Sequence, residues 1–251
     1  MQLEEYQDRF ETIHFARSAA GVLEMRIHTR GGPAVWGVSE QGLHNELGLA
    51  FAALASDCSN KILLLTGTGD SFVEAMDKEA PPPEKNSADL WARIRREGVA
   101  LLDRFMAVPI PVVVAVNGPA LIHAELAVLG DIVLASETAC FADIAHIPGG
   151  IVPGDGVQTV WPMLLGPNRG RYFLLTGQRI DAEEALRLGI VGEVLPPEKL
   201  LPRAHEIAAR LADLPEMTLR HTRTLLVRDL RRRLADELEM GLALESLAAM
   251  R

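Results

Sequence analysis

The sequence of 251 residues contains only two cysteines, Cys58 and Cys140, and no CxxC pair. Two such residues cannot build a disulfide framework, and the cysteine spacing of a structural zinc site is missing. No apolar run reaches about 18 residues, so an ordinary transmembrane helix is excluded. Residues 1–15 are acidic and lack the apolar stretch of a secretory signal. We therefore expect a cytoplasmic globular protein without a membrane partner.

Basic residues are also few. The chain has 25 Lys and Arg against 34 Asp and Glu, which gives a net charge of −9 and a pI near 5.3. An acidic surface disfavours sequence-independent binding to phosphates. The one basic cluster, Arg231–Arg233, lies in a stretch of alternating charge that is typical of a solvated or intersubunit face. The composition thus predicts no nucleic-acid partner.

Several catalytic signatures are missing. The sequence has no HExxH spacing for a catalytic metal and no GxSxG nucleophile elbow, and neither cysteine has a neighbouring base. The Gly67-Thr-Gly69 turn lacks the third glycine of a dinucleotide-binding fingerprint. We expect neither a metal nor a cofactor.

The first half of the chain alternates between strand and helix patterns. Buried parallel strands show continuous apolar runs, and amphipathic helices repeat apolar residues every three or four positions. These patterns predict a hairpin of 11–17 and 22–29, a helix over 39–58 with Ser39 as its N-cap, a buried strand at 61–66, a proline-rich loop at 78–88, a helix at 89–105, a buried strand at 111–116, a short helix at 124–129 and a strand at 132–134.

The second half is mostly helical. After a glycine-rich loop, the pattern predicts helices near 157–165, 168–175, 181–188, 198–213 and 216–250, and one strand at 191–195. This order predicts an α/β fold with a parallel sheet and right-handed crossovers. Ligands of such sheets lie beyond the carboxyl ends of the strands, so we expect the chemistry in loops 67–77, 117–123 and 140–155.

Two ionisable residues, His146 and Asp155, flank the glycine-rich loop, which can fold back to bring them together. A carboxylate that holds one imidazole nitrogen leaves the other free to act as a base for water. In the alternative interpretation, His146 caps a backbone carbonyl and Asp155 braces the turn. Residue types and spacing alone do not separate these two interpretations.

Other polar and aromatic residues are weaker candidates. His123 can donate to an oxygen that gains negative charge, or it can be a structural histidine at a helix start. Glu125, two positions on, points to a different side if both residues lie on a helix. Trp36 and His44 are by default packing residues. Glu245 lies on an otherwise apolar stripe, where a buried carboxylate needs a partner.

At this point the motifs resemble those of the crotonase (enoyl-CoA hydratase/isomerase) superfamily. They are Ile62-Leu-Leu-Leu-Thr-Gly-Thr-Gly-Asp-Ser-Phe72, Val112-Val-Val-Ala-Val-Asn-Gly-Pro119, Asp131-Ile-Val-Leu-Ala135, Leu175-Thr-Gly177 and Asp181-Ala-Glu-Glu-Ala185 with Gly189-Ile-Val191. The resemblance implies an α/β spiral core of stacked ββα turns over residues 1–195 and a helical trimerisation region over 196–251. It also implies assembly as a homotrimer or a dimer of trimers.

The chain departs from the CoA-ester enzymes of this superfamily. Leu121-Ile-His-Ala124 replaces their glycine-rich oxyanion turn, and Glu74-Ala-Met-Asp77 replaces Ala-Gly-Ala-Asp. Glu125 matches one catalytic glutamate of the hydratases, but the place of the second, near Ala145 and His146, holds no carboxylate. A CoA-ester hydratase or isomerase that uses Glu125 is the alternative function. A binding or scaffold protein that has lost activity is another.

The stretch His146-Ile-Pro-Gly-Gly-Ile-Val-Pro-Gly-Asp-Gly156, followed by Val160-Trp-Pro162, is similar to one branch of the superfamily. This branch includes 6-oxocamphor hydrolase and related β-diketone hydrolases, which cleave a carbon–carbon bond by retro-Claisen chemistry. The resemblance implies that His146, polarised by Asp155, activates water and that His123 handles the enolate oxygen. It also implies a pocket lined by Trp36, His44 and Glu245. The expected reaction is hydrolysis of a small, cyclic β-diketone to a keto acid without a cofactor.

Overall fold

The computed structural model describes residues 1–79 and 87–250. Its main sheet has the strand order β1-β2-β3-β4-β5-β8, with β1 and β2 antiparallel and the other neighbours parallel. The strands are β1 (Ile13–Arg17), β2 (Val22–Ile27), β3 (Ile62–Thr66), β4 (Val112–Val116), β5 (Ile132–Ser136) and β8 (Glu193–Leu195). The predicted hairpin and the predicted parallel sheet are both confirmed. Every residue of β3 and β4 is buried, as their continuous apolar runs require.

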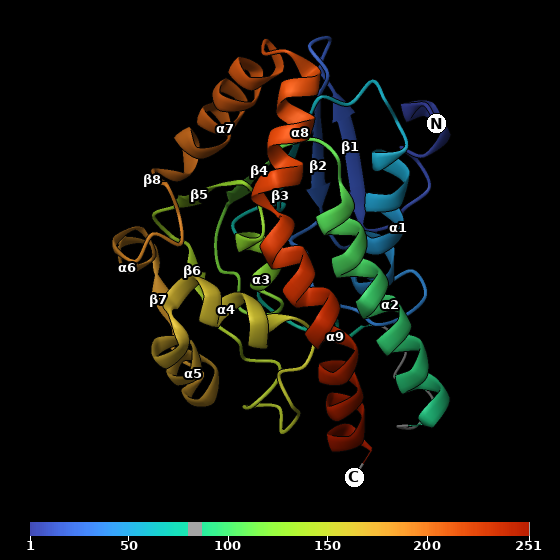
Figure 1. The fold of residues 1–251 in the computed structure, drawn as a ribbon, viewed down its shortest axis with the longest axis vertical. Coiled ribbons are helices and arrows are strands. Elements are labelled where there is room, and N and C mark those ends of the chain that lie inside the picture. The colour runs from blue at the N-terminus through green and yellow to red at the C-terminus, as the bar shows by residue number, and fades with distance from the viewer. Residues whose placement is uncertain (80–86, 251) are drawn as a thin grey trace.

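A second, two-stranded sheet pairs β6 (Cys140–Phe141) with β7 (Ile180–Asp181). Neither strand is predicted from the sequence, because two residues are too few to show an alternating pattern. This small sheet lies below the main sheet in Figure 1.

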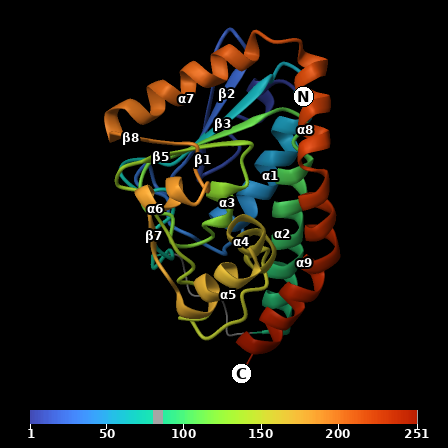
Figure 2. The ribbon, with the colours of Figure 1, turned by 60° about the vertical axis from the view of Figure 1, so that its left-hand side comes forward.

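Helices cover both faces of the main sheet. The described helices are the 3-10 turn η1 (Leu3–Glu5) and α1 (Leu43–Ala55), α2 (Ala88–Ala107), α3 (Glu125–Val128), α4 (Val157–Leu165), α5 (Pro167–Thr176), α6 (Ala182–Arg187), α7 (Pro197–Ala212), α8 (Glu216–Leu226) and α9 (Arg228–Ala249). Helix α7 packs on one face of the sheet, whereas α1, α2 and α9 lie on the other side (Figure 2). The predicted boundary at residue 195 falls between β8 and α7.

Two details of the helix prediction are wrong. Ser39 does not cap α1, which begins at Leu43 after a turn that leaves Gly42 in the N-cap position. Gly42 packs so closely on Gly37 that a Cβ there would lie 2.4 Å from the Gly37 carbonyl oxygen. The helix predicted over 216–250 is divided into α8 and α9 at Val227.

The predicted loop 78–88 lies partly outside the described residues, which exclude 80–86. At its end, Ser87 caps α2 by accepting a hydrogen bond from the Leu90 N–H. No helix in the described ranges is both long enough and apolar enough to cross a membrane.

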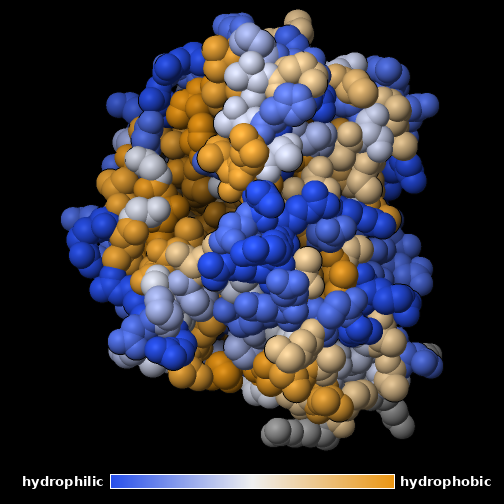
Figure 3. Space-filling view, in the orientation of Figure 1, coloured by the Kyte–Doolittle hydropathy of each residue, from blue (hydrophilic) through white to orange (hydrophobic). Residues whose placement is uncertain are grey.

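The basic cluster Arg231–Arg233 lies at the start of α9, where a band of hydrophilic residues crosses the molecular surface (Figure 3). Its guanidinium groups pair with carboxylates. Arg232 and Arg233 each lie 3.0 Å from Asp229, and Arg231 lies 3.8 Å from Asp103. The cluster is therefore a surface of mixed charge.

Candidate active site

The loops that follow β3 and β4 are held together by one side chain. Asn117 accepts a hydrogen bond from the Gly67 N–H at 3.1 Å and donates to the carbonyls of Gly69 and Ser71. Gly118 must be glycine because a Cβ there would lie 1.7 Å from the Asp70 carbonyl oxygen. The two loops predicted to carry chemistry therefore leave the sheet side by side.

Isolated β-bridges extend this arrangement beyond the sheet. They join Trp36 to Met76, Val73 to Ala120, and Ala120 to Phe141. Each bridge connects segments that are far apart in the sequence. Together they bring the segments that carry Trp36, His123 and His146 next to one another.

His146 lies between two carboxylates. Its Nδ1 is 2.7 Å from Asp143 Oδ1, and its Nε2 is 3.2 Å from Asp155 Oδ2. The structure thus brings His146 and Asp155 together, as predicted, and the ring nitrogens contact carboxylates rather than a backbone carbonyl. Asp143 is not among the site residues predicted from the sequence. An Asp three positions before a histidine, outside any helix, carries no periodic signal.

A tight turn holds His146 in this place. The Ile144 N–H donates to the Leu121 carbonyl, and the Ile151 N–H donates to the His146 carbonyl at 3.0 Å. Gly149 packs on the same turn, where a Cβ would lie 2.2 Å from the Ala145 carbonyl oxygen. The glycine-rich sequence therefore folds back over His146 because a side chain at residue 149 would prevent it.

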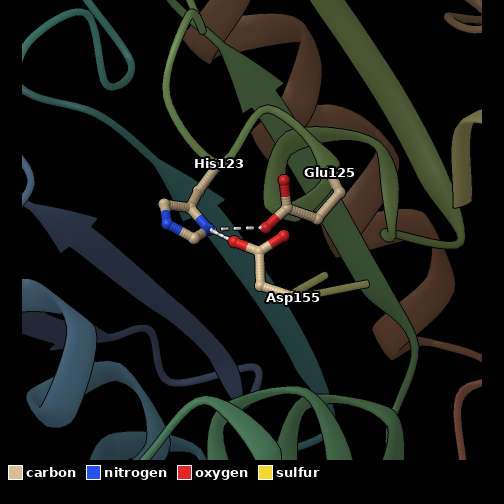
Figure 4. Close-up of side chains that lie close together, drawn as sticks. All are labelled: His123, Glu125 and Asp155. Carbon is tan, nitrogen blue, oxygen red and sulfur yellow. Dashed lines mark hydrogen bonds and ion pairs between the residues drawn. The ribbon is translucent and has the colours of Figure 1, made fainter. Parts of the chain in front are cut away.

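Asp155 is shared by two imidazoles. Its Oδ2 lies 2.8 Å from His123 Nδ1 as well as 3.2 Å from His146 Nε2. Figure 4 shows the carboxylate of Asp155 facing His123, with Glu125 on the same side of the ring. The His123 and His146 ring centroids are 6.0 Å apart. One carboxylate therefore couples both candidate catalytic histidines.

His123 has an unusual backbone conformation, with a φ of 49°. A left-handed backbone conformation is uncommon for a residue other than glycine because it is strained, and residues strained in this way are often found at functional sites. This conformation turns the ring toward Glu125, whose Oε1 lies 2.9 Å from His123 Nδ1. The expectation that Glu125 points to a different side is wrong, because His123 precedes α3 and does not follow helical geometry. The second ring nitrogen of His123 points away from both carboxylates (Figure 4).

Trp36 and His44 lie against His123. The indole of Trp36 stacks on the His123 ring with centroids 3.7 Å apart and an interplanar angle of 24°. His44 meets Trp36 edge-on at 5.5 Å. His44 Nε2 donates to the Ile94 carbonyl at 3.1 Å, which leaves Nδ1 buried without a partner among the described residues.

Glu245 reaches the site from α9. The backbones of Gly154 and Gly241 touch, and a Cβ on either would lie within 2.2 Å of the other's carbonyl oxygen. This contact presses α9 against the residue before Asp155, and Glu245 follows Gly241 by one helical turn. Glu245 is buried, and its Oε2 has no hydrogen-bond partner among the described residues.

The charges in this cluster shift the ionisation of its members. Burial lowers the pKa of both His123 and His146, but the nearby carboxylates outweigh it. The pKa of His123 rises to about 10, mainly through Asp155 and Glu125, and that of His146 rises well above 6.5 through Asp155 and Asp143. Both imidazoles are therefore stabilised in the protonated form.

The remaining groups are shifted by burial. Burial lowers the pKa of His44 to about 4, so this ring is neutral at pH 7. Burial and the charge of Asp155 raise the pKa of Glu245 to about 8, so its carboxyl group holds a proton at pH 7. Burial also raises the pKa of Glu125. The pKa of Asp155 falls well below 3.8, because the two histidines overcome the effect of burial. Asp155 is thus a carboxylate between two cationic rings, and Glu245 is a neutral acid.

Two sets of three residues have the side chains that a metal ion could use. They are His123, Glu125 and Asp155, and His146, Asp155 and Glu245, with the ligand atoms of each set within 4.8 Å of one another. Both sets use Asp155. A metal ion at either place would therefore compete with the ion pairs that Asp155 makes to the histidines.

The site is nearly closed to solvent. His146 is 1% exposed, and the side chain of His123 is 11% exposed under the stacked Trp36. A separate pocket of about 290 Å³ is lined by Val35, Gly37 and Leu43, among others, which flank Trp36 and His44 in the chain.

Comparisons with known proteins agree with this architecture. The family described as enoyl-CoA hydratase/isomerase matches residues 17–247. A carnitinyl-CoA dehydratase of Citrobacter koseri is 33% identical over 81% of this chain and 75% of that protein.

Solved structures of the same fold are also similar. A β-diketone hydrolase from the cyanobacterium Anabaena, bound to (S)-3-oxocyclohexyl acetic acid, is 40% identical with a TM-score of 0.94, over 98% of this chain and 97% of that chain. An enoyl-CoA hydratase/isomerase from Mycobacterium paratuberculosis is 27% identical with a TM-score of 0.83, over 97% and 96% of the two chains. The chain belongs to the enoyl-CoA hydratase/isomerase family, within the crotonase superfamily, and has the crotonase fold.

Proposed function

We propose that this protein hydrolyses a carbon–carbon bond of a cyclic β-diketone by a retro-Claisen reaction. The observation that carries the proposal is the bracketing of Asp155 by two imidazoles, at 2.8 Å from His123 and 3.2 Å from His146. In such a site, one histidine can take a proton from water and the other can donate a hydrogen bond to the departing enolate. The similarity to the Anabaena β-diketone hydrolase supports the same chemistry.

The first step is the attack of water on one carbonyl. A water molecule at the edge between His146 and Asp155 gives one proton to His146 Nε2 and directs its other O–H to the Asp155 carboxylate. The resulting hydroxide adds to the carbonyl carbon and forms a tetrahedral intermediate. General-base catalysis of this kind contributes about 10²–10⁴-fold in rate. His146 acts in the fraction of molecules whose Nε2 is free of its proton.

The second step is cleavage of the carbon–carbon bond. The tetrahedral intermediate collapses to a carboxylic acid, and the bonding electron pair passes to the carbon between the two carbonyls. The second carbonyl takes up this charge as an enolate. His123 donates from the nitrogen that points away from Asp155 and Glu125, and its stable positive charge makes it a strong donor to the enolate oxygen.

The third step is proton transfer to the enolate carbon. Glu245 suits this role because its carboxyl group is protonated at pH 7 and its Oε2 has no other partner among the described residues. His44 suits it less, because its ring is neutral and its Nε2 hydrogen is given to the Ile94 carbonyl. The proton that His146 took from water later replaces the one that Glu245 gave.

The keto acid bound to the Anabaena enzyme suggests a test substrate. If its carboxyl carbon is joined to the ring carbon on the far side of the ketone, with loss of water, a bicyclic 1,3-diketone results. Incubation of the protein with this diketone should produce the keto acid and release one proton per turnover, measured by chromatography and by pH-stat titration. The proposal is wrong if a panel of cyclic and bicyclic diketones, this compound included, gives no enzyme-dependent product.

The named relatives favour one other candidate, a CoA-ester hydratase or isomerase that uses Glu125. In that case a short acyl-CoA should bind measurably by titration calorimetry, and the Glu125→Gln variant should lose its turnover. The hydrolase proposal predicts no such binding. A protein that neither binds acyl-CoA nor cleaves any diketone would instead be an inactive member of the superfamily.

We also propose that the protein assembles as a homotrimer or a dimer of trimers. Leu225 and Leu226 at the end of α8 are each more than 70% exposed in the single chain, which supports burial against another subunit. Analytical ultracentrifugation should give the mass of three or six chains, and a monomer would contradict the proposal.

A further inference from the structure

Asp143 has a restricted set of contacts. Its Oδ1 accepts a hydrogen bond from His146 Nδ1 at 2.7 Å and a longer one from the His146 backbone N–H at 3.4 Å. Within residues 1–79 and 87–250, no other group hydrogen-bonds this side chain, and its Oδ2 is buried without a partner. Asp143 is 2% exposed. A buried carboxylate is costly unless it is paired, so its placement needs an explanation.

The contact determines which nitrogen of His146 can react. A carboxylate accepts a hydrogen bond and cannot donate one, so His146 Nδ1 must carry a hydrogen. When the ring is neutral, its lone pair is therefore on Nε2. This nitrogen faces Asp155 and lies on the side of His123.

The two carboxylates around His146, those of Asp143 and Asp155, thus differ in the side chains that they contact. Among the described residues, Asp143 forms hydrogen bonds with His146 alone, whereas Asp155 lies 2.8 Å from His123 and 3.2 Å from His146. An orienting group must stay in place throughout the reaction. The contact of Asp155 with Nε2, by contrast, must open to admit the water.

We propose that Asp143, rather than Asp155, is the positioning residue that orients His146 and fixes its reactive nitrogen as Nε2. Asp155 then holds the attacking water and couples His146 to His123. This inference rests on the proposed hydrolase function. It revises the role that the sequence analysis expected for Asp155.

The Asp143→Asn variant tests the proposal. An asparagine whose amide donates to Nδ1 favours the opposite tautomer, with the hydrogen on Nε2, and so blocks the base. With the bicyclic diketone as substrate, we expect kcat to fall about 10²–10⁴-fold. KM should stay within about threefold, because Asp143 does not touch the substrate.

Asp57→Asn is the matched control. Asp57 is also 2% exposed and is hydrogen-bonded by Arg17, Tyr6 and the Ser59 N–H, away from the site. Both variants lose a buried carboxylate and should lose thermal stability. Only Asp143→Asn should lose kcat. An equal loss of kcat in the two variants, or none in Asp143→Asn, overturns the proposal.

A second readout does not depend on activity. Nitrogen-15 NMR of the imidazole, assigned with the His146→Gln variant, reports which ring nitrogen keeps its hydrogen as the pH is raised. The wild-type ring should lose the Nε2 hydrogen and keep that on Nδ1, and the Asp143→Asn ring should do the reverse. Loss of the Nδ1 hydrogen in the wild-type protein overturns the proposal, even if the diketone assay has already failed for another reason.

Discussion

Gly154 and Gly241 lie in direct backbone contact. A Cβ added to Gly154 would lie only 2.1 Å from the Gly241 carbonyl oxygen. The first glycine precedes Asp155 and the second lies one helical turn before Glu245. This contact connects Asp155 to Glu245, two of the acidic residues of the site, through closely packed backbone.

Gly241→Ala should therefore lower both stability and activity. Glycine to alanine in a helix normally stabilises by up to about 1 kcal/mol. Here the added methyl group forces α9 away from Gly154, and overpacking of this kind costs about 1–3 kcal/mol. Thermal denaturation should show a lower Tm than wild type. Gly98→Ala in α2 is the control, since its Cβ would meet no atom closer than 3.4 Å. A higher Tm for Gly241→Ala would contradict the packing argument.

Asp155→Asn should nearly abolish diketone hydrolysis. The substitution removes the negative charge that stabilises both imidazolium rings, so the pKa values of His123 and His146 should both fall. His123 then becomes a weaker donor to the enolate oxygen, and the attacking water loses its second partner. We expect kcat/KM to fall at least about 10²-fold, measured by initial rates of keto acid formation. A variant with turnover near that of wild type would show that Asp155 has no part in the reaction.

The proposed roles also predict how the rate depends on pH. His146 must lose a proton to act as a base, and its pKa lies well above 6.5, so kcat/KM should still be rising above that pH. Glu245 and His123 must both keep their protons, and their pKa values are about 8 and about 10, so activity should fall again as the pH rises past about 8. The result is a bell-shaped profile. Initial rates over this range, with Asp143→Asn for comparison, provide the measurement. A maximum below pH 6.5 would be incompatible with His146 as the base.

The elements of the main sheet could be predicted because their residues signal locally. Strands β3 and β4 are continuous apolar runs, and the loops after them begin with Gly67-Thr-Gly69 and Asn117-Gly-Pro119. These features depend on neighbouring residues alone, and the structure confirms them. The glycines between His146 and Asp155 allow the chain to reverse, but residue types and spacing leave their pairing open. The resemblance to the β-diketone hydrolases implies the pairing, and the structure places His146 Nε2 3.2 Å from Asp155 Oδ2.

Two features of the site that the sequence does not predict are the direction of Glu125 and the contact of Asp143 with His146. Both depend on contacts between distant segments. The Glu125 side chain faces the His123 ring because His123 has a left-handed backbone, and the residue type of His123 does not predict that conformation. Asp143 reaches His146 because the bridge from Ala120 to Phe141 and the Ile144–Leu121 hydrogen bond hold its segment in place. Such non-local constraints leave no spacing pattern in one sequence.

Glu245→Gln should remove a pH-dependent loss of stability. The pKa of Glu245 is about 8 in the folded protein and 4.5 for the ordinary group, so between these values the folded state binds more protons than the unfolded state. Stability contributed by this group is therefore present below pH 4.5 and is lost as the pH rises toward 8. A glutamine keeps the shape of the neutral acid and cannot ionise. The difference in Tm between pH 5 and pH 8 should thus be smaller in Glu245→Gln than in wild type. Glu239→Gln, at an exposed position of the same helix, should leave that difference unchanged.

The Glu245→Gln variant should also protonate the enolate more slowly, because it has no acidic proton to give. If its Tm difference equals that of wild type, the buried carboxyl group does not hold a proton at neutral pH and is not the acid of the reaction.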